Sequence, residues 1–261
     1  MIIAIVSVGC NPSDSITQLF VTARSSRHDV CFRLFLHSRH PMTMQACERL
    51  AAEPGVTYYP YGENRGVSKS WNEGMLDAYQ AGADVVIIVN DDVHFSPYDV
   101  DKLAEKATRN PDRYIVSCAG YHGRFGCKIP SHGYACFAIN PIALRRLGCF
   151  DENFFPAYCE DQDYAYRARL AGLSEENCAD TMVYHLGSAA IFSDAALRQQ
   201  NCYTHGQNMQ YYRRKWGGDG GQEIFTQPFN NSHLGYYIAP EQRHVPYGAS
   251  YDRVDREIVK V

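Results

Sequence analysis

The chain reads VVIIVNDDV over residues 85–93, five β-branched apolar residues followed at once by three polar ones. Such an apolar run is typical of a strand that is buried on both faces, as in a parallel sheet covered by helices. Ligands of open α/β sheets bind beyond the carboxyl ends of the strands, where Asn90, Asp91 and Asp92 fall. Oxygen-bearing side chains at alternate positions, here Asn90 and Asp92, suit a hard divalent cation that carries a substrate diphosphate. The alternative is that the acidic pair only opens the turn before Ser96 and caps the next helix.

Strands and helices alternate on both sides of this stretch. Apolar runs predict strands over residues 2–8, 30–36, 56–59, 114–118 and 134–139, and helical spacing predicts helices over residues 13–25, 44–52, 67–81, 97–109 and 141–147. Residues 120–133, rich in glycine, are expected to form a loop that either carries an acceptor lid or only connects two strands. Alternation of this kind is typical of a doubly wound sheet with right-handed crossovers. The sequence therefore predicts an α/β, Rossmann-like fold whose mixed, mostly parallel sheet has helices on both faces.

The composition limits the class of protein. With 261 residues the chain is long enough for one large α/β domain, which we place at residues 1–200, with a C-terminal extension over residues 201–261 that packs on it and shapes the acceptor site. A formal charge of −4 gives no global basic field for nucleic acid or anionic lipid. No apolar run reaches the ~18 residues of a membrane span. No basic leader precedes the first strand, and the ten cysteines include no Cys-x-x-Cys pair. We expect a protein without a membrane span, with reduced thiols, in a cytoplasm.

A second polar segment precedes the helix after the third predicted strand. Residues 63–74 read ENRGVSKSWNEG, in which Gly66 permits a tight turn before apolar residues recur at helical spacing. The N-terminus of this helix therefore points to the same edge of the sheet. Free backbone N–H groups there, with Arg65 and Lys69 nearby, would suit a phosphate. The alternative is an ordinary helix start with an exposed basic pair.

Two further clusters follow. Glu160, Asp161 and Asp163 stand at the start of a helix that Gly172 closes. Carboxylates favour a helix N-terminus whatever the function, but three of them beside aromatic residues suggest that one serves as a base. His185 ends a short apolar strand, as a satisfied core histidine or as a neutral imidazole that binds a Mn²⁺-type ion.

Taken in this order, the clusters resemble those of the family-2-like GT-A glycosyltransferases over about residues 1–188. The resemblance implies that residues 90–92 are the "DxD" element, which holds a divalent metal, Mn²⁺ or Mg²⁺, and the nucleotide diphosphate. It implies that Asp92 is the metal contact and that His185 is a further metal ligand.

The resemblance also implies a catalytic base and a nucleotide site. The base falls on Asp161, with Glu160 and Asp163 beside it. The residues implied to contact the nucleotide are Asn11, Asn64, Arg65, Gly66, Lys69, Asn72, Asn90 and Asp91, and three of these, Asn64, Gly66 and Asn72, match the "NxG…N" segment of the family. One departure is Asn90, which replaces the first Asp of the "DxD" element and removes one charge. Another is residues 37–40, HSRH, where members often carry an acidic residue, so the nucleotide base that is recognised stays open.

The C-terminal stretch joins aromatic and cationic residues. Residues 211–218 read YYRRKWGG. Aromatic rings interleaved with cations could stack on a sugar or a base and clamp a phosphate. Alternatively, a terminal helix packs Tyr211 and Trp216 on the sheet and exposes its charges. Residues 215–218, KWGG, together with Glu223, Phe225, Pro228 and Phe229, look similar to a run in short stand-alone glycosyltransferase-like proteins of bacteriophages, some of which decorate hydroxymethylated pyrimidines in DNA.

The predicted function is the metal-dependent, inverting transfer of a sugar from a nucleotide-diphosphate sugar to a hydroxyl of a glycan, a small molecule or modified DNA. One alternative is a phage DNA-modifying glycosyltransferase that acts on hydroxymethylated pyrimidines in the host cytoplasm. Another is a catalytically degenerate GT-A protein that only binds nucleotides or glycans. A nucleotidyltransferase is disfavoured, because residues 9–12 are not the Gly-rich, Arg-containing loop that such an enzyme needs after its first strand. A retaining outcome and the oligomeric state stay open.

Overall fold

The computed structural model describes residues 1–187 and 195–235. In this part of the chain nine strands form one sheet in the order β3-β2-β1-β4-β8-β6-β9-β5, with β7 paired to β6. The strands are β1 (Ile2–Gly9), β2 (Asp29–Leu36), β3 (Val56–Tyr59), β4 (Val85–Val89), β5 (Val93–His94), β6 (Ile115–His122), β7 (Cys127–Ile129), β8 (Cys136–Ile139) and β9 (Glu176–His185). The helices are α1 (Ser15–Ala23), α2 (Pro41–Ala51), α3 (Val67–Gln80), α4 (Asp99–Arg109), α5 (Pro141–Leu147), α6 (Glu160–Leu170) and α8 (Ala195–Trp216), with 3₁₀ turns η1 (Gly133–Ala135) and η2 (Pro228–Asn230).

Parallel pairing organises the N-terminal half of the sheet. β1 pairs with β2 on one side and β4 on the other, with Ile5 opposite both Phe32 and Ile87, and β2 pairs with β3. β8 runs antiparallel between β4 and β6, and β9 runs parallel to β6. The predicted α/β fold with a mixed, mostly parallel sheet is confirmed. Because β1 to β4 run in one direction, their carboxyl ends lie at one edge of the sheet, directly before residues 90–92 in the case of β4.

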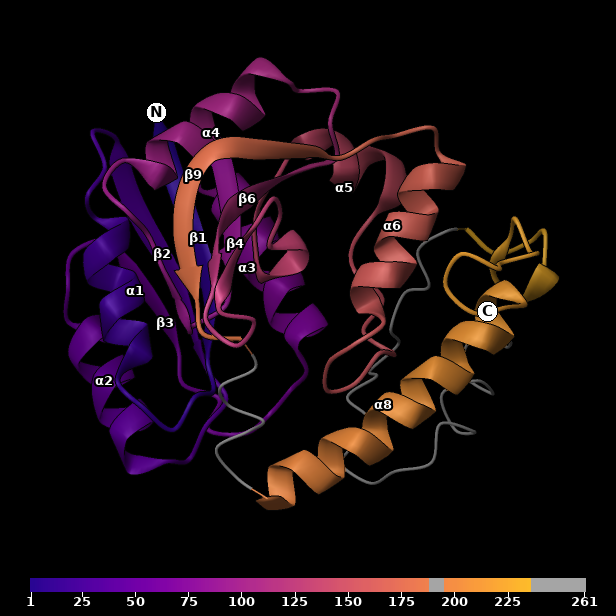
Figure 1. Ribbon diagram of the computed structural model, residues 1–261, viewed down its shortest axis with the longest axis horizontal. Helices are drawn as coiled ribbons and strands as arrows, with labels where there is room; N and C mark the ends of the chain where they lie inside the picture. Colours follow the sequence, from indigo (N-terminus) through magenta and orange to yellow (C-terminus); the bar gives the residue numbers. More distant parts are fainter. Residues whose placement is uncertain (188–194, 236–261) are drawn as a thin grey trace.

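Helices cover both faces of the sheet, with α1 and α2 on one side and α3 and α6 on the other (Figure 1). Alternate residues of β1 divide between two apolar cores. Ile3 and Ile5 belong to the core that includes α1, α2 and α4, whereas Ala4 and Val6 belong to the core that includes α3, α5 and α6. Every residue of β4 is at most 1% exposed, which confirms the strand that is buried on both faces.

Residues 120–133 form a hairpin rather than the predicted loop. β6 continues to His122 and the chain returns as β7, with Cys127 opposite His122. The N–H of Gly126 donates to the carbonyl of His122, and Gly126 has a φ of 64°. The glycines that suggested an irregular connection therefore supply the tight turn of the hairpin, because a positive φ favours glycine.

β9 is also longer than the sequence indicated, since only residues near His185 were predicted to lie in a strand. It spans ten residues, and polar side chains such as Glu176 and Asn177 interrupt the apolar pattern that would have marked it. A register shift separates Cys118 from Gly120 where β6 pairs with β9. Gly120 is required there, because a Cβ would lie 1.9 Å from the carbonyl oxygen of Val183.

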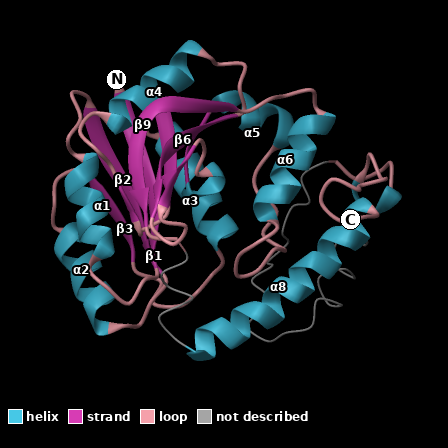
Figure 2. Ribbon diagram, in the orientation of Figure 1, coloured by secondary structure: helices cyan, strands magenta, loops and turns pink. Residues whose placement is uncertain are grey.

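Helix α8 lies beside α6 (Figure 2) and runs across residue 200. A third apolar core joins it to α6 and to the segment before α6; its buried members are Phe154, Phe155, Cys159, Tyr166, Tyr211, Tyr212 and Trp216. Along residues 1–187 and 195–235, no helix combines the length and apolar character that crossing a membrane requires.

Candidate functional site

The three polar residues after β4 have different environments. Asn90 is partly exposed, whereas Asp91 and Asp92 are buried. The Asp91 carboxylate accepts hydrogen bonds from the N–H groups of Cys10 and Asn11, each at 2.8 Å, and from the side-chain amide of Asn11. Burial, and secondly the charge of Asp92, raises the pKa of Asp91 to about 6. Asp91 and Asn11 thus bind each other and tie the turn after β1 to the end of β4.

Asp92 lies beside His185, as the resemblance implied. The Oδ1 atom of Asp92 is 3.2 Å from Nε2 of His185, and its Oδ2 accepts a hydrogen bond from the N–H of Gly187 at 3.2 Å. The pairing of β5 with β9 brings them together, because Val93 lies directly opposite His185. Ser188, where the predicted resemblance over residues 1–188 ends, lies outside the described residues.

Two histidines that the sequence analysis did not single out complete this cluster. His122 ends β6, and His132 precedes η1. The ring centroids of His122 and His132 are 5.1 and 5.5 Å from that of His185 and 6.0 Å from each other. Burial and the neighbouring His185 and His122 lower the pKa of His132 to about 4, so its ring is neutral at pH 7. The only sequence signal was their position at the two ends of a glycine-rich stretch.

The donor set at this edge suits a divalent ion in chemistry. Asp92 offers a carboxylate and His185 an imidazole whose two nitrogens are buried without a hydrogen bond. Across residues 1–187 and 195–235, no three His, Cys, Asp or Glu side chains are already arranged to hold a metal ion. An ion that is bound here through few protein ligands would take the remainder from substrate phosphates and water, which is common for Mg²⁺-type sites.

The start of α3 is built as the sequence predicted. The N–H of Gly66 donates to Oδ1 of Asn64 at 3.0 Å, and the N–H of Val67 donates to the carbonyl of Pro156 at 2.9 Å. Gly66 has a φ of 83°, and a Cβ there would lie 3.0 Å from the ring of Phe155. The turn before α3 is therefore packed against the segment that leads to α6.

The two basic residues near this helix start have local partners. Arg65 lies over the ring of Tyr61 at 4.4 Å and is 3.2 Å from Glu63. Lys69 is 2.8 Å from Glu73, one turn further along α3. Both are partly exposed, so a phosphate could exchange for these surface contacts, which contribute little energy.

Asn72 is withdrawn from the surface. It is 3% exposed, accepts a hydrogen bond from the N–H of Phe150 and donates to the carbonyl of the same residue and to Glu152. Its side chain therefore fixes α3 to the segment that begins at Phe150, and it reaches the predicted nucleotide site only through its neighbours.

Glu160 and Asp161 open α6. Glu160 is 5% exposed, its Oε2 is buried without a hydrogen bond, and burial followed by the charge of Asp161 raises its pKa well above the ordinary value. Asp161 is partly exposed, and burial again raises its pKa. Burial, and secondly the neighbouring Tyr114, raises the pKa of Tyr134, and the charge of Asp161 adds to this shift.

Asp163 is fully buried in an ion-pair network. Its carboxylate is 2.9 Å from Nε of Arg167 and 2.6 Å from Nζ of Lys215, and it accepts a hydrogen bond from the indole of Trp216 at 2.8 Å. Lys215 is also 2.7 Å from Asp151. These contacts give Asp163 a structural environment, unlike that of Asp161 two residues earlier.

The aromatic residues of the C-terminal stretch are buried, as the packing alternative predicted, but they pack against α6 and the segment before it and not on the sheet. Tyr211 and Trp216 are 0% exposed, and Arg213 and Arg214 are exposed. Lys215 differs from that expectation because it is buried with the aromatics. Residues 236–261 of the predicted extension lie outside the described residues.

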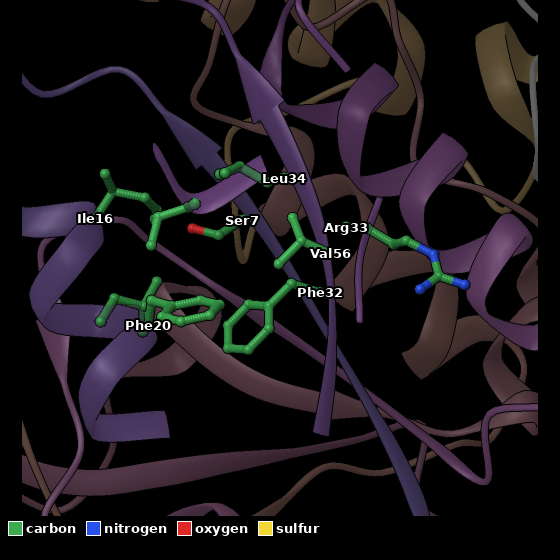
Figure 3. Close-up of a pocket in the computed structure, with 9 residues that line it drawn as sticks. Ser7, Ile16, Phe20, Phe32, Arg33, Leu34 and Val56 are labelled. Carbon is green, nitrogen blue, oxygen red and sulfur yellow. The ribbon is translucent and has the colours of Figure 1, made fainter. Parts of the chain in front are cut away.

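A small cavity in the core is separate from these clusters. It has a volume of about 10 Å³ and lies between α1 and the first strands, among Ser7, Ile16, Phe20, Phe32 and Val56 (Figure 3). The hydroxyl of Ser7 is buried there without a hydrogen bond. A space of this size holds at most one water molecule, so it is no nucleotide site.

Comparison with solved structures identifies the fold. Staphylococcus aureus TarS, residues 1–349, superposes with a TM-score of 0.56 at 14% identity, over 83% of this chain and 74% of that one. The mannosyltransferase PcManGT from Pyrobaculum calidifontis, in complex with GDP-Man and Mn²⁺, superposes with a TM-score of 0.56 at 16% identity, over 78% of this chain and 62% of that one. The chain therefore has the GT-A fold that was predicted.

Sequence comparison matches part of the chain to glycosyltransferases. The profile described as "Glycosyl transferase family 2" matches residues 41–150. A galactofuranosyl glycosyltransferase of Leishmania donovani is 33% identical over 102 residues, which cover 33% of this chain and 24% of that protein. The chain thus spans about a quarter of the length of that relative. The predicted resemblance to family-2 glycosyltransferases is confirmed, and its matched part includes β4 and residues 90–92.

Proposed function

We propose that the protein transfers a sugar from a nucleotide-diphosphate sugar to an acceptor hydroxyl, with inversion at the anomeric carbon. The observation that carries the proposal is the placement of two chemically different centres on a GT-A fold. Asp92 and His185 lie together beyond β4, and the partly exposed Asp161 stands in the first turn of α6.

The donor site is assigned to the edge of the sheet at the end of β4. A divalent ion there would be held by Asp92 and His185, and when bound it would neutralise the departing diphosphate. PcManGT with GDP-Man and Mn²⁺, and TarS with UDP-GlcNAc, support a nucleotide sugar as the donor class. To Arg65 and Lys69, near the start of α3, we assign the cations for the phosphates; the N–H groups of Gly66 and Val67, which the sequence suggested for this role, already donate to Asn64 and Pro156.

The base is assigned to Asp161. The acceptor hydroxyl loses its proton to this carboxylate, its oxygen bonds to the anomeric carbon, and the bond to the diphosphate breaks, which releases the nucleoside diphosphate. A carboxylate with a raised pKa is a stronger base than an ordinary aspartate, so the direction of the shift suits the role. To Asp163 we assign a positioning role, because it anchors α6 from within the core.

Thermal unfolding tests the proposal. The purified chain is heated with a panel of nucleotide-diphosphate sugars, each with and without Mn²⁺, and Asp92→Asn is measured beside it. A ligand at ~100 times its dissociation constant adds roughly 2.7 kcal/mol to the stability of the folded state. We expect a metal-dependent shift for one donor, and loss of that shift in Asp92→Asn. The absence of a shift with every donor would contradict the proposed function.

A further inference from the structure

His122 and His132 of the β6–β7 hairpin face the same point as Asp92 and His185, although they lie far apart in the chain. The pairing of β6 with β9 sets His122 directly opposite His185. His132 returns to the sheet through a hydrogen bond from its N–H to the carbonyl of Cys118 at 2.7 Å. Three imidazole rings thus meet beside one buried carboxylate.

Five ring nitrogens of this cluster are buried without a hydrogen bond, and one of them, Nε2 of His185, has only the ion-pair contact with Asp92 at 3.2 Å. His132 is 8% exposed and His185 is 7% exposed, and in each ring both nitrogens are buried without a hydrogen-bond partner. The same holds for Nδ1 of His122. A buried polar group that is left unpaired costs about 1–3 kcal/mol. An arrangement that accumulates several of them indicates a ligand that satisfies them.

The spacing of the rings suits a single ion. An imidazole nitrogen bonds to a transition metal at about 2.1 Å, which places the ring centroid about 3.2 Å from the ion and two such centroids about 5.2 Å apart at a tetrahedral angle. The centroids of His122 and His132 are 5.1 and 5.5 Å from that of His185, close to this value, and 6.0 Å from each other, which is wider. The separation of 3.2 Å between Asp92 Oδ1 and His185 Nε2 is likewise that of two ligand atoms of one ion.

We propose that His122 and His132 join Asp92 and His185 as ligands of the metal ion, and that this chain therefore selects a nitrogen-binding transition metal over Mg²⁺. The proposal deepens the proposed function, on which it rests for the location of the donor. Among the described residues, no three of these side chains already have the arrangement of a metal site, so the rings of His122 and His132 would have to turn about their side-chain bonds to hold the ion.

Gly187 explains how the cluster is kept together. It has a φ of 88°, and a Cβ at this position would lie 2.4 Å from the ring of His122. Its N–H donates to Asp92. The absence of a side chain at Gly187 therefore allows the imidazole of His122 to lie next to the residue that holds the carboxylate of Asp92.

The ligand types decide the choice of ion. Mg²⁺ is a hard ion that prefers oxygen ligands and retains its water, whereas imidazole suits Zn²⁺, Co²⁺ and the other first-row divalent ions. A site with one carboxylate and three imidazoles thus favours these ions. A site with Asp92 and His185 alone would leave most positions to phosphate and water and would discriminate less.

The test uses Co²⁺ as the probe and the full chain without nucleotide. Its visible absorption responds to the number of nitrogen ligands, so a titration reports both binding and ligand type. His122→Gln and His132→Gln are compared with His40→Gln, which changes an exposed histidine at the start of α2. Competition of Mg²⁺ with Co²⁺ in the unchanged protein is a second measurement that needs no variant.

We expect Co²⁺ to bind at least about tenfold more weakly in His122→Gln and in His132→Gln, with altered absorption, and to bind unchanged in His40→Gln. Mg²⁺ at equal concentration should not displace it. Equal Co²⁺ affinity in all variants, displacement by Mg²⁺, or no Co²⁺ binding would overturn the assignment. A donor-induced shift in melting temperature is measured on the same samples. A protein that binds Co²⁺ through these histidines but binds no donor would refute the proposed function and leave the metal assignment intact.

Discussion

Replacing Lys215 with methionine perturbs the buried charges that join α8 to α6. Nζ of Lys215 is 2.7 Å from Asp151 and 2.6 Å from Asp163, and all three side chains are fully buried. Methionine keeps the apolar stem but leaves both carboxylates without their shared cation. Loss of one partner from a buried ion pair costs about 3–5 kcal/mol. We expect the free energy of unfolding to fall by about 4 kcal/mol and the melting temperature by roughly 10 °C.

Urea denaturation followed by circular dichroism measures this loss. The control is Arg213→Met, two residues earlier on α8, where the ion pair with Asp219 is about half exposed and contributes little to stability. If Lys215→Met costs no more than Arg213→Met, the buried network does not hold the two helices together.

The pH dependence supplies a second check on the same network. Burial alone would raise the pKa of Asp151, but the Lys215 ammonium holds it below the ordinary value. A carboxylate whose pKa is lower in the folded than in the unfolded protein stabilises the folded state at pH values above its unfolded pKa. This stabilisation is lost as the pH falls through the lowered pKa of the folded state. The difference in stability between the wild-type protein and Lys215→Met should therefore shrink in acid. A difference that stays constant down to the acid limit of folding would refute the ionic origin.

Two further predictions concern the proposed site. Asp161→Asn should lower kcat about 10²–10⁴-fold while donor-induced thermal shifts persist. Because the pKa of Asp161 is raised, the rate of the wild-type enzyme should begin to fall in acid at a higher pH than it would with an ordinary aspartate as the base. If Asp161→Asn keeps the wild-type rate, Asp161 is not the base. Gly66→Ala should cost about 1–3 kcal/mol and weaken donor binding, since its φ of 83° and the nearby Phe155 ring both oppose a Cβ. Its control, Gly62→Ala, also has a positive φ but meets nothing within 4 Å, so equal effects in the two variants would show that the contact with Phe155 is unimportant.

Local patterns in the sequence predicted most of the helices and strands. The apolar run of β4, the strand over residues 56–59 and the helix over residues 141–147 appear where they were predicted, because burial and proline or glycine at the ends mark such elements locally. The β6–β7 hairpin was not predicted, because four glycines in residues 120–133 suggest a loop whether or not strands border them. β9 was mostly missed because its polar residues interrupt the alternation expected of a strand.

The site could be predicted from the sequence only where the resemblance to a known family indicated which residues come together. The proximity of Asp92 and His185 followed from the resemblance, and the contacts of Asp91 with Asn11 could not be foreseen because they depend on the parallel pairing of β1 with β4. His122 and His132 join the cluster through strand pairing between distant segments, which leaves no local signature. Asp161 and Asp163 stand in the same short acidic cluster, and the sequence does not distinguish them. Only the fold shows that Asp163 is buried and Asp161 is partly exposed.

The contacts between α8 and the segment before α6 have a consequence for the order in which parts of the protein fold during synthesis. Asn208 of α8 donates hydrogen bonds to the carbonyls of Ala157 and Tyr158, and Lys215 neutralises Asp151. A nascent chain that ends before Lys215 contains all nine described strands, but burying the Asp151 carboxylate without its cation is unfavourable. We therefore expect the segment that leads to Asp161 to take its final position only after α8 has been synthesised, so that the proposed base is positioned late.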